Sequence, residues 1–199
     1  MKIGILISGR GSNMMAIAAA ARAGAIPAEV ALVLSNRPQA LGLEWARQQG
    51  LRTCALPSAA REREDYDREL VRNLREAGVE LVCLAGYMRL LSGYFVHEYR
   101  ERILNIHPSL LPAFPGLDAQ QQALDYGVTF SGCTVHFVDE SLDGGPVILQ
   151  AVVPVLPGDD VAALSARILE QEHRIYPAAI RLVASGAWRL EGRLVRAKA

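Results

Sequence analysis

Short apolar segments alternate with amphipathic segments through the first half of the chain. The apolar segments have the length of buried strands, and the segments between them carry apolar residues at helical spacing. Strands are predicted at residues 2–8, 29–35, 52–56, 79–85 and 102–106, and helices at 13–24, 41–50 and 65–77. Because strands that are apolar throughout are covered on both faces, this order predicts a mostly parallel, Rossmann-like sheet flanked by helices.

The pattern changes after residue 128. Two longer strand-like segments, 129–139 and 147–155, are joined by residues 140–146. Antiparallel strands can be connected directly, whereas parallel strands need a long crossover. These segments therefore predict an antiparallel hairpin in the C-terminal part, with a loop that is long for a hairpin.

The last large predicted element is a helix that begins at Asp159-Asp160, an N-cap signal, and continues toward Gly186. Pro177 predicts a kink or a break in this helix, because proline lacks the N–H group that a helix interior needs. A short strand pair around Trp188 and Leu194 is expected to follow. The whole chain is therefore placed in the α/β class.

Composition narrows the classes of protein that this pattern allows. Of the 199 residues 51% are apolar, and the 21 basic residues equal the 21 acidic residues in number. A chain of this length buries about 70% of its unfolded surface, so one core and a single domain over residues 1–199 are expected. The net charge of zero argues against a protein whose main work is to bind nucleic acid or an anionic membrane.

Neither a membrane span nor a secretion signal is expected. The longest apolar segments fall far short of the roughly 20 residues that cross a bilayer, and the N-terminus enters the first predicted strand directly. The three cysteines, Cys54, Cys83 and Cys133, lie in apolar, strand-like surroundings and are predicted to be buried free thiols. These features predict a cytoplasmic location.

The first candidate site is the loop Ser8-Gly9-Arg10-Gly11-Ser12-Asn13, between the first strand and the first helix. Backbone N–H groups and the helix dipole favour an anion at such a position. The loop is not a Walker A motif, since it has no Gly-Lys-Ser/Thr, and Met14 replaces the third glycine of the dinucleotide fingerprint. We interpret the loop as a phosphate site; a tight strand-to-helix turn is the alternative.

The second candidate site is the polar end of the strand at 102–106. Strand alternation places Asn105 and His107 on one side, at the sheet edge where ligands of α/β proteins collect. An amide beside an imidazole can stabilise an oxyanion and move a proton, which suits transfer of an acyl group to an amine. A purely structural histidine is about as compatible with the pattern.

Asp143 lies in the loop of the predicted hairpin, in Leu142-Asp143-Gly144-Gly145. An ordinary turn aspartate is the alternative reading, because Asp is common in turns. If the loop folds back over the sheet edge, the carboxylate would raise the pKa of the His107 imidazole and hold its tautomer. The sequence alone leaves this contact open.

Glu172 is unusual because it interrupts an otherwise mostly apolar helix row. A carboxylate there needs a partner, either a salt bridge or the amine or hydroxyl of a ligand. His173 beside it is undecided in the same way. His97 and His136 are predicted to be structural, because neither has the spacing of a zinc ligand, and no metal is implied.

Five motifs together resemble the folate-dependent phosphoribosylglycinamide formyltransferase family. In chain order they are Ser8-Gly9-Arg10-Gly11-Ser12-Asn13, Leu84-Ala85-Gly86-Tyr87-Met88-Arg89-Leu90-Leu91, Asn105-Ile106-His107-Pro108-Ser109-Leu110-Leu111-Pro112, Leu142-Asp143-Gly144-Gly145-Pro146 and Gln171-Glu172-His173. The resemblance covers nearly the whole chain. The Asn-x-His and Leu-Asp-Gly-Gly motifs resemble all formyltetrahydrofolate-dependent transferases, whereas the first loop resembles the glycinamide ribonucleotide enzymes in particular.

The resemblance implies a formyltransferase fold, with a phosphate-binding half over residues 1–100 and a folate-binding and catalytic half over 101–199. It implies transfer of the formyl group of 10-formyltetrahydrofolate, as co-substrate, to the primary amine of glycinamide ribonucleotide. The products would be formylglycinamide ribonucleotide and tetrahydrofolate, in de novo purine biosynthesis. The implied partners are these small molecules, without metal, nucleic acid or membrane, and a homo-oligomer is left open.

The resemblance also assigns residues to each part of the reaction. The ribonucleotide phosphate would bind to Gly11, Ser12 and Asn13, and its glycinamide end would meet Glu172. The folate would contact Arg63, Met88, Arg89, Leu90, Leu91 and Asn105, where Arg63 is assigned from the family's Arg-Glu-x-Tyr-Asp pattern.

In the implied mechanism, the neutral amine attacks the formyl carbon and gives a tetrahedral oxyanion. Asn105 and His107 would stabilise it, and His107 would donate a proton to the leaving folate nitrogen. Asp143 would keep the pKa of His107 high and help to move the proton of the amine. Two residues depart from the family pattern: Tyr87, often Phe, would add a hydroxyl near the folate, and Asp118, often His, is left outside the site.

Three other functions compete with this interpretation. Formyl transfer to methionyl-tRNA or to a sugar nucleotide usually comes with a longer, more basic chain. Hydrolysis of the formyl folate usually comes with an N-terminal regulatory domain, whereas here the core pattern starts at Lys2. A non-catalytic nucleotide-binding module would keep only the phosphate loop, and the presence of Asn105, His107 and Asp143 together argues against it.

Overall fold

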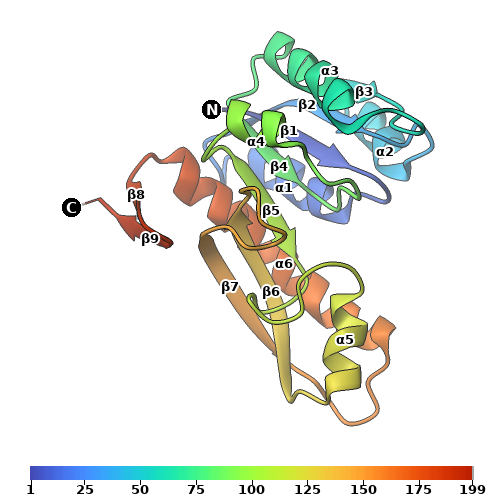
Figure 1. Cartoon of the computed structure of the whole chain (residues 1–199), viewed down its shortest axis with the longest axis vertical. Coiled ribbons are helices and arrows are strands. Elements are labelled where there is room, and N and C mark those ends of the chain that lie inside the picture. The colour runs from blue at the N-terminus through green and yellow to red at the C-terminus, as the bar shows by residue number, and fades with distance from the viewer. Residues whose placement is uncertain (199) are drawn as a thin grey trace. The chain divides into compact units, whose positions relative to one another are not determined.

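The computed structural model describes residues 1–198 and divides into two compact units, Met1–Asn105 and Ile106–Ala199. The boundary falls inside β5 (Ile103–His107). The single domain over residues 1–199 stays a prediction. The elements are coloured along the chain in Figure 1.

The first unit alternates strands and helices as the sequence predicts. Its elements are β1 (Lys2–Ile7), α1 (Ser12–Arg22), β2 (Glu29–Ser35), α2 (Leu41–Gln48), β3 (Thr53–Ala55), α3 (Arg63–Glu76), β4 (Leu81–Leu84), α4 (Gly93–Glu98) and β5. The strands are parallel, in the order β3-β2-β1-β4-β5. β1 is buried from its second residue and β4 throughout, as expected of strands covered on both faces.

Close packing of α3 on the sheet depends on a glycine in β1. A Cβ atom at Gly4 would lie 2.7 Å from Leu74 Cδ2 and 3.0 Å from Val79 Cγ1, so the helix approaches the strand closely there. α3 also begins two residues before its predicted start, because the Glu62 side chain accepts hydrogen bonds from the N–H groups of Glu64 and Asp65.

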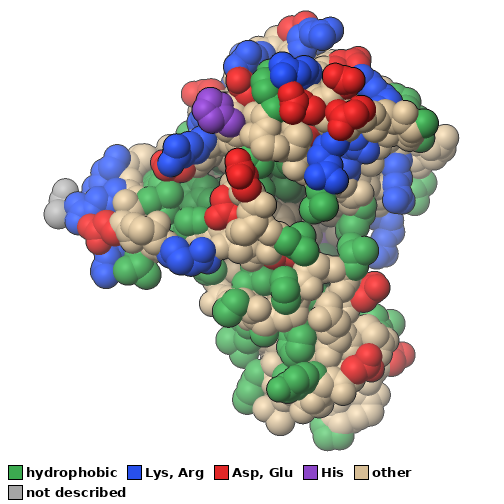
Figure 2. Space-filling model, viewed as in Figure 1, with side chains coloured by type: hydrophobic (Ala, Val, Ile, Leu, Met, Phe, Trp, Pro, Cys, Tyr) green, Lys and Arg blue, Asp and Glu red, His purple; other side chains and the backbone are tan. Residues whose placement is uncertain are grey.

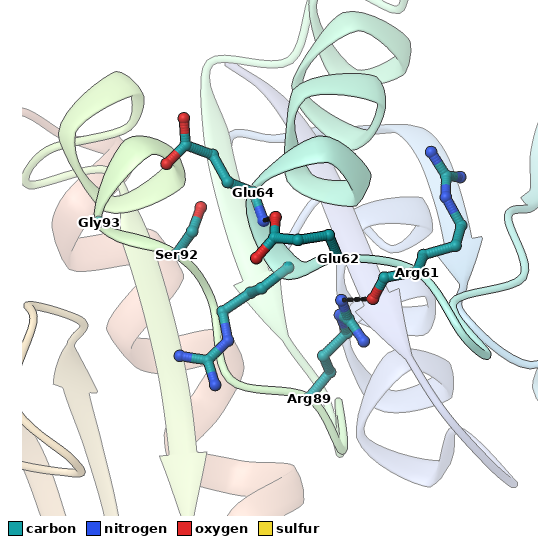
Figure 3. A pocket seen from close by; sticks show the side chains of 7 residues that line it. Arg61, Glu62, Glu64, Arg89, Ser92 and Gly93 are labelled. Atoms are coloured by element: carbon teal, nitrogen blue, oxygen red, sulfur yellow. Dashed lines mark hydrogen bonds between the residues drawn. The ribbon is translucent and has the colours of Figure 1, made fainter.

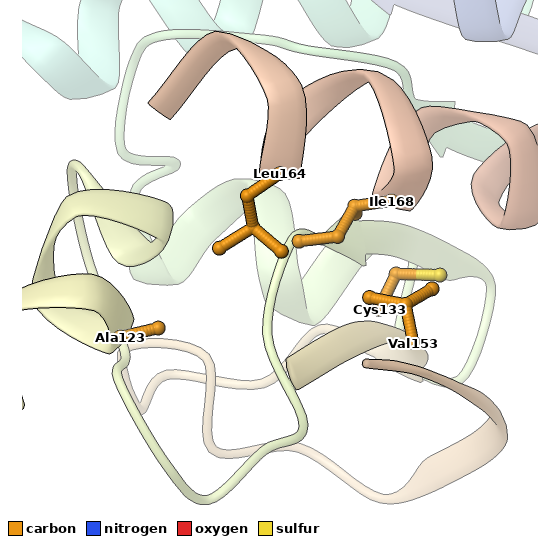
Figure 4. Close-up of a cluster of buried hydrophobic side chains, with 5 residues drawn as sticks. All are labelled: Ala123, Cys133, Val153, Leu164 and Ile168. Atoms are coloured by element: carbon orange, nitrogen blue, oxygen red, sulfur yellow. The ribbon is translucent and has the colours of Figure 1, made fainter. Parts of the chain in front are cut away.

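The second unit contains the predicted antiparallel hairpin of β6 (Phe130–Phe137) and β7 (Val147–Pro154). The long helix α6 (Val161–Ala184) packs against both strands. The core between them consists of Ala123, Cys133, Val153, Leu164 and Ile168, with Leu164 and Ile168 reaching from α6 toward the strands (Figure 4). The unit also contains α5 (Ala119–Tyr126), β8 (Trp188–Glu191) and β9 (Leu194–Ala197).

One prediction about the elements is wrong, and two short helices were missed. α6 continues through Pro177 as one helix, so the break that this proline allowed is wrong. The short helices α4 and α5 were not predicted. α4 has six residues and α5 has eight, too few for a helical period to stand out from a loop.

The cysteines are free thiols, as predicted, with Cys83 and Cys133 buried and Cys54 only half-buried. Burial raises the pKa of the Cys133 thiol to about 12. On the face seen in Figure 2, basic and acidic side chains are interspersed over the helices of the first unit. Within residues 1–198, no helix is both long and apolar enough to cross a membrane.

Candidate active site

The glycine-rich loop leads directly into α1. Gly11 is the N-cap residue, with φ of 74°, a left-handed conformation that favours glycine. Its carbonyl accepts the N–H of Met15 at 2.9 Å. The cap makes no side-chain hydrogen bond and the first turn has no acidic residue, so no side chain of the cap or first turn neutralises the positive end of the helix dipole.

The start of α2 contacts the backbone of the glycine-rich loop. The N–H of Gly42 donates to the carbonyl of Gly9 at 3.1 Å. A Cβ atom at Gly42 would lie 2.6 Å from Ile7 Cδ1 and 3.1 Å from the carbonyl oxygens of Gly9 and Arg10. The start of α2 therefore sets the position of the loop backbone, which the sequence did not indicate.

A buried hydrogen-bond chain joins the loops that follow β1, β2 and β4. The Ser8 hydroxyl donates to Asn36 Oδ1 at 2.6 Å and accepts the N–H of Met88 at 2.8 Å. Asn36 Nδ2 donates to Ser58 Oγ at 3.2 Å, and the Ser8 N–H donates to the Gly86 carbonyl at 3.1 Å. Ser8 therefore links the glycine-rich loop to the Met88 segment directly, and Asn36 extends the chain to Ser58.

Two of the residues assigned to the folate line one cavity of about 490 Å³ in the first unit, shown in Figure 3. The cavity is lined by Arg61, Glu62, Arg63, Glu64, Arg89, Ser92 and Gly93. The Arg89 guanidinium lies 4.7 Å from the centre of the Tyr66 ring and donates to the Arg61 carbonyl at 3.4 Å. Met88 and Leu90 are exposed and Leu91 is half-buried on the same segment.

Tyr87, which replaces the phenylalanine often found in the family, lies in the core of the first unit. Tyr87 is buried, and its hydroxyl donates to the Tyr66 hydroxyl at 3.4 Å. The Tyr66 hydroxyl donates in turn to the carbonyl of Leu56 at 2.9 Å. Burial raises the pKa of both tyrosines, so they stay protonated and serve as neutral hydrogen-bonding groups.

The contact that the sequence left open is present in the second unit. His107 Nδ1 lies 3.4 Å from Asp143 Oδ2, and the imidazole is buried. On the other side of the ring, Nε2 lies 2.8 Å from the carbonyl oxygen of Phe114. Since a carbonyl only accepts, Nε2 carries the proton of this hydrogen bond.

Asn105 precedes His107 by two positions on β5. Alternate residues of a strand point to the same side, so the amide and the imidazole share one face of this strand. Asn105 is half-buried, which leaves part of its side chain accessible. That the amide acts as an oxyanion donor and the imidazole as a proton carrier stays a prediction.

Sequence reasoning missed His136, which also faces Asp143. Its Nε2 lies 3.8 Å from Asp143 Oδ1, and its Nδ1 donates to the Phe137 carbonyl at 2.8 Å. Burial lowers the pKa of His136, although the Phe137 carbonyl and the Asp143 charge oppose this shift. The signal was available, because His136 lies near the end of the predicted strand that leads into the Asp143 loop.

Gly145 lies close to the backbone of Phe137, where β6 ends and the loop that contains Asp143 begins. A Cβ atom at Gly145 would lie 1.9 Å from the Phe137 carbonyl oxygen, so no side chain fits there. The Phe137 N–H donates to the Pro146 carbonyl at 2.9 Å. Asp143 itself has φ of 49°, and its Oδ2 accepts the N–H of Gly116 at 2.8 Å. These contacts hold the carboxylate beside His107.

The segment after His107 is ordered by side chains of the hairpin. Thr134 Oγ1 donates to the Ser109 carbonyl at 2.7 Å and accepts the N–H of Leu111 at 3.0 Å. Gln150 Nε2 donates to the Leu111 carbonyl at 2.9 Å. Because the Phe114 carbonyl follows on this segment, the hairpin also positions the group that bonds His107 Nε2.

The remaining candidates are on other elements. Glu172 is buried on α6. Burial of the Cys133 thiol raises its pKa, and the charge of Glu172 adds to this shift. His173 is half-buried, and desolvation lowers its pKa. Asp118 is exposed at the start of α5, consistent with its exclusion from the site. In the part of the chain that the structure describes, no group of three His, Cys, Asp or Glu residues could hold a metal.

The sequence and the fold are similar to those of known proteins. The formyl transferase family pattern matches residues 1–180. The phosphoribosylglycinamide formyltransferase of Escherichia coli (strain K12) is 51% identical over 187 residues, which cover 94% of this chain and 88% of that protein. A crystal structure of glycinamide ribonucleotide transformylase 1 from Symbiobacterium toebii has a TM-score of 0.98 and 55% identity, covering 100% of this chain and 94% of that one.

Other relatives are larger or more distant. The trifunctional purine biosynthetic protein adenosine-3 of Drosophila pseudoobscura pseudoobscura is 52% identical over 94% of this chain, which spans only 14% of that protein. A formyltetrahydrofolate deformylase from Pseudomonas syringae shares the fold, with a TM-score of 0.92 at 24% identity. The matches over nearly the whole chain lead to one conclusion: this chain belongs to the formyl transferase family.

Proposed function

We propose that this protein transfers the formyl group of 10-formyltetrahydrofolate to the primary amine of glycinamide ribonucleotide. The products are formylglycinamide ribonucleotide and tetrahydrofolate, and the reaction belongs to purine biosynthesis in the cytoplasm. The observation that carries the proposal is the contact of Asp143 with His107, in a chain 51% identical to the Escherichia coli phosphoribosylglycinamide formyltransferase.

The ribonucleotide phosphate binds at Gly11, Ser12 and Asn13. The N–H groups at this helix start and the absence of an acidic side chain in the first turn support that assignment. Glu172 meets the glycinamide end of the substrate. The Gln171-Glu172-His173 motif, which resembles that of the family, supports this assignment.

The folate binds along Met88, Arg89, Leu90 and Leu91, together with Arg63 and Asn105. The exposed apolar side chains of Met88 and Leu90 suit the flat ring system of the folate. Arg63 and Arg89 line one cavity and suit its carboxylates. In addition, the buried Arg89 Nε has no hydrogen-bond partner among the described residues, which leaves a donor for a ligand.

The chemistry is attack of the neutral amine nitrogen on the formyl carbon. A C–N bond forms, and the carbonyl oxygen becomes an oxyanion that Asn105 and His107 stabilise. The bond from the formyl carbon to the folate nitrogen then breaks, and that nitrogen takes a proton from His107. Asp143 stabilises the protonated imidazole and helps to carry away one proton from the amine. One proton therefore leaves the amine for each proton that the folate nitrogen gains.

The test is a spectrophotometric assay of folate release with and without glycinamide ribonucleotide. We expect release only when the ribonucleotide is present, with severe loss in His107→Ala and wild-type activity in the matched control His97→Ala, whose side chain is exposed on α4. Release without the ribonucleotide would instead indicate a hydrolase. No release in either condition, with phosphate binding intact, would indicate a binding module.

A further inference from the structure

We propose that Arg193 is a positioning residue, which holds the loop that carries Asp143 in the conformation that places the carboxylate beside His107. This inference rests on the function proposed above. It concerns the hairpin of β8 and β9, which none of the assigned site residues occupies. The hairpin lies in the same unit as Asp143 and His107.

The first observation is a hydrogen bond from the hairpin to the loop. The Arg193 guanidinium, which lies just before β9, donates from Nη2 to the carbonyl of Gly144. This carbonyl belongs to the residue directly after Asp143. Since a guanidinium presents donors in a fixed planar arrangement, the bond restrains the peptide plane between Gly144 and Gly145, one residue after Asp143.

The second observation is that the hairpin is itself anchored at the base of the loop. The Trp188 ring packs on the Phe137 ring, with the centroids 4.9 Å apart, and Trp188 Nε1 donates to the Val183 carbonyl at 3.0 Å. Phe137 is the last residue of β6, and its N–H bonds the Pro146 carbonyl across the loop. The hairpin thus contacts both the base of the loop and the carbonyl beside Asp143.

The third observation distinguishes Arg193 from its neighbours. Arg189 and Arg196 both form ion pairs with Glu191, inside the hairpin. Arg193, in contrast, reaches outside the hairpin to the loop. Arg193 adds to the restraints that the Phe137 and Gly116 N–H groups already place on the loop. It acts where Gly144 and Gly145 have no side chains and where Asp143 adopts a left-handed conformation with φ of 49°.

The experiment compares Arg193→Ala with Arg196→Ala, a matched loss of one arginine from the same hairpin. Turnover and KM are measured with 10-formyltetrahydrofolate and glycinamide ribonucleotide, and amide exchange is followed in residues 139–146. We expect Arg193→Ala to lower kcat by about three- to ten-fold at nearly constant KM for the ribonucleotide, the effect of losing one ordinary, solvent-exposed hydrogen bond. It should also speed exchange in the loop, and Arg196→Ala should change neither.

Two further variants connect the effect to Asp143. Arg193→Lys should recover part of the lost kcat, since it keeps a charged donor. In an Asp143→Asn background, Arg193→Ala should have less than about a two-fold effect, because the carboxylate that it positions is already gone. Independent, multiplying effects would overturn the proposal, as would an Arg193→Ala variant that matches Arg196→Ala in kcat and in exchange.

The outcomes separate this inference from the proposed function. Wild-type turnover in Asp143→Asn would refute the catalytic role of the carboxylate, and with it any positioning role in catalysis. Faster loop exchange in Arg193→Ala would still establish the restraint itself. If Asp143→Asn is severely impaired while Arg193→Ala leaves both kcat and exchange unchanged, the function stands and the positioning role of Arg193 is wrong.

Discussion

A methyl group added at Gly42 would test how the phosphate loop is held in place. In Gly42→Ala the new Cβ would lie 2.6 Å from Ile7 Cδ1 and 3.1 Å from the carbonyl oxygens of Gly9 and Arg10. Carbon atoms in contact settle at about 3.5–4.0 Å, so the Ile7 side chain has to retreat by roughly 1 Å. The two carbonyls have to move as well, and they belong to the loop that we assign to phosphate binding.

The free energy of unfolding should change little, while binding of the ribonucleotide should change more. Overpacking costs about 1–3 kcal/mol, but alanine in place of glycine in a helix returns about 1 kcal/mol, which leaves a net loss of roughly 0–2 kcal/mol. Each hydrogen bond to a charged phosphate oxygen contributes about 1.5–3 kcal/mol. Misalignment of one such bond should therefore raise the dissociation constant of glycinamide ribonucleotide by about ten-fold or more.

Isothermal titration calorimetry with glycinamide ribonucleotide measures this change directly. The matched control is Gly4→Ala, on β1, the strand that also contains Ile7. The new Cβ would lie 2.7 Å from Leu74 Cδ2, a contact that involves α3 and not the loop. We expect Gly4→Ala to lose stability but to keep wild-type affinity. The reasoning is refuted if Gly42→Ala binds the ribonucleotide as tightly as the wild type, or if both variants weaken binding equally.

Three further predictions concern catalysis, pH and packing. Asn105→Ala should lose on the order of 3 kcal/mol of transition-state stabilisation, measured as kcat/KM; near-wild-type turnover would exclude an oxyanion donor. Burial holds the pKa of His136 below its usual 6.5, so the unfolded chain takes up a proton at a higher pH than the folded protein does. The free energy of unfolding should therefore fall as the pH drops below 6.5, by up to about 1.4 kcal/mol per pH unit. Urea titrations should give a shallower slope for His136→Gln. Leu164→Ala should cost about 3 kcal/mol of unfolding free energy in the same titrations, and a loss below about 1 kcal/mol would contradict the packing in Figure 4.

The parts of the fold that follow from local pattern could be predicted from the sequence. The strands of the first unit are short apolar segments, and α6 has a clear N-cap, since the Asp160 side chain accepts the N–H of Ala163 at 2.7 Å. The short helix α4 could not be found by periodicity. Its cap, Ser92, accepts the N–H of Phe95, but a serine cap is informative only next to a longer apolar period.

The candidate site was predictable as a set of residues but not as a set of contacts. His107 and Asp143 were assigned from motifs, and their contact depends on how the loop after β6 folds back, which no local pattern encodes. His136 was predicted to be structural because it lacks the spacing of a zinc ligand, a criterion that does not detect a nearby carboxylate. No local pattern encodes the link between Ser8 and Asn36, since the two residues follow different strands.

The loop that we assign to phosphate binding and the loop that contains Asp143 are positioned in the same way. In each, a glycine on a contacting backbone permits an approach that a side chain would block: Gly42 against the carbonyl of Gly9, and Gly145 against the carbonyl of Phe137. Neither glycine supplies a group to the reaction. Because backbone carbonyls move only with their whole segment, a methyl group at either position displaces a loop rather than one side chain. Loss of function should therefore extend to positions that touch neither substrate, and such positions are identified by backbone distances rather than by the chemistry of their side chains.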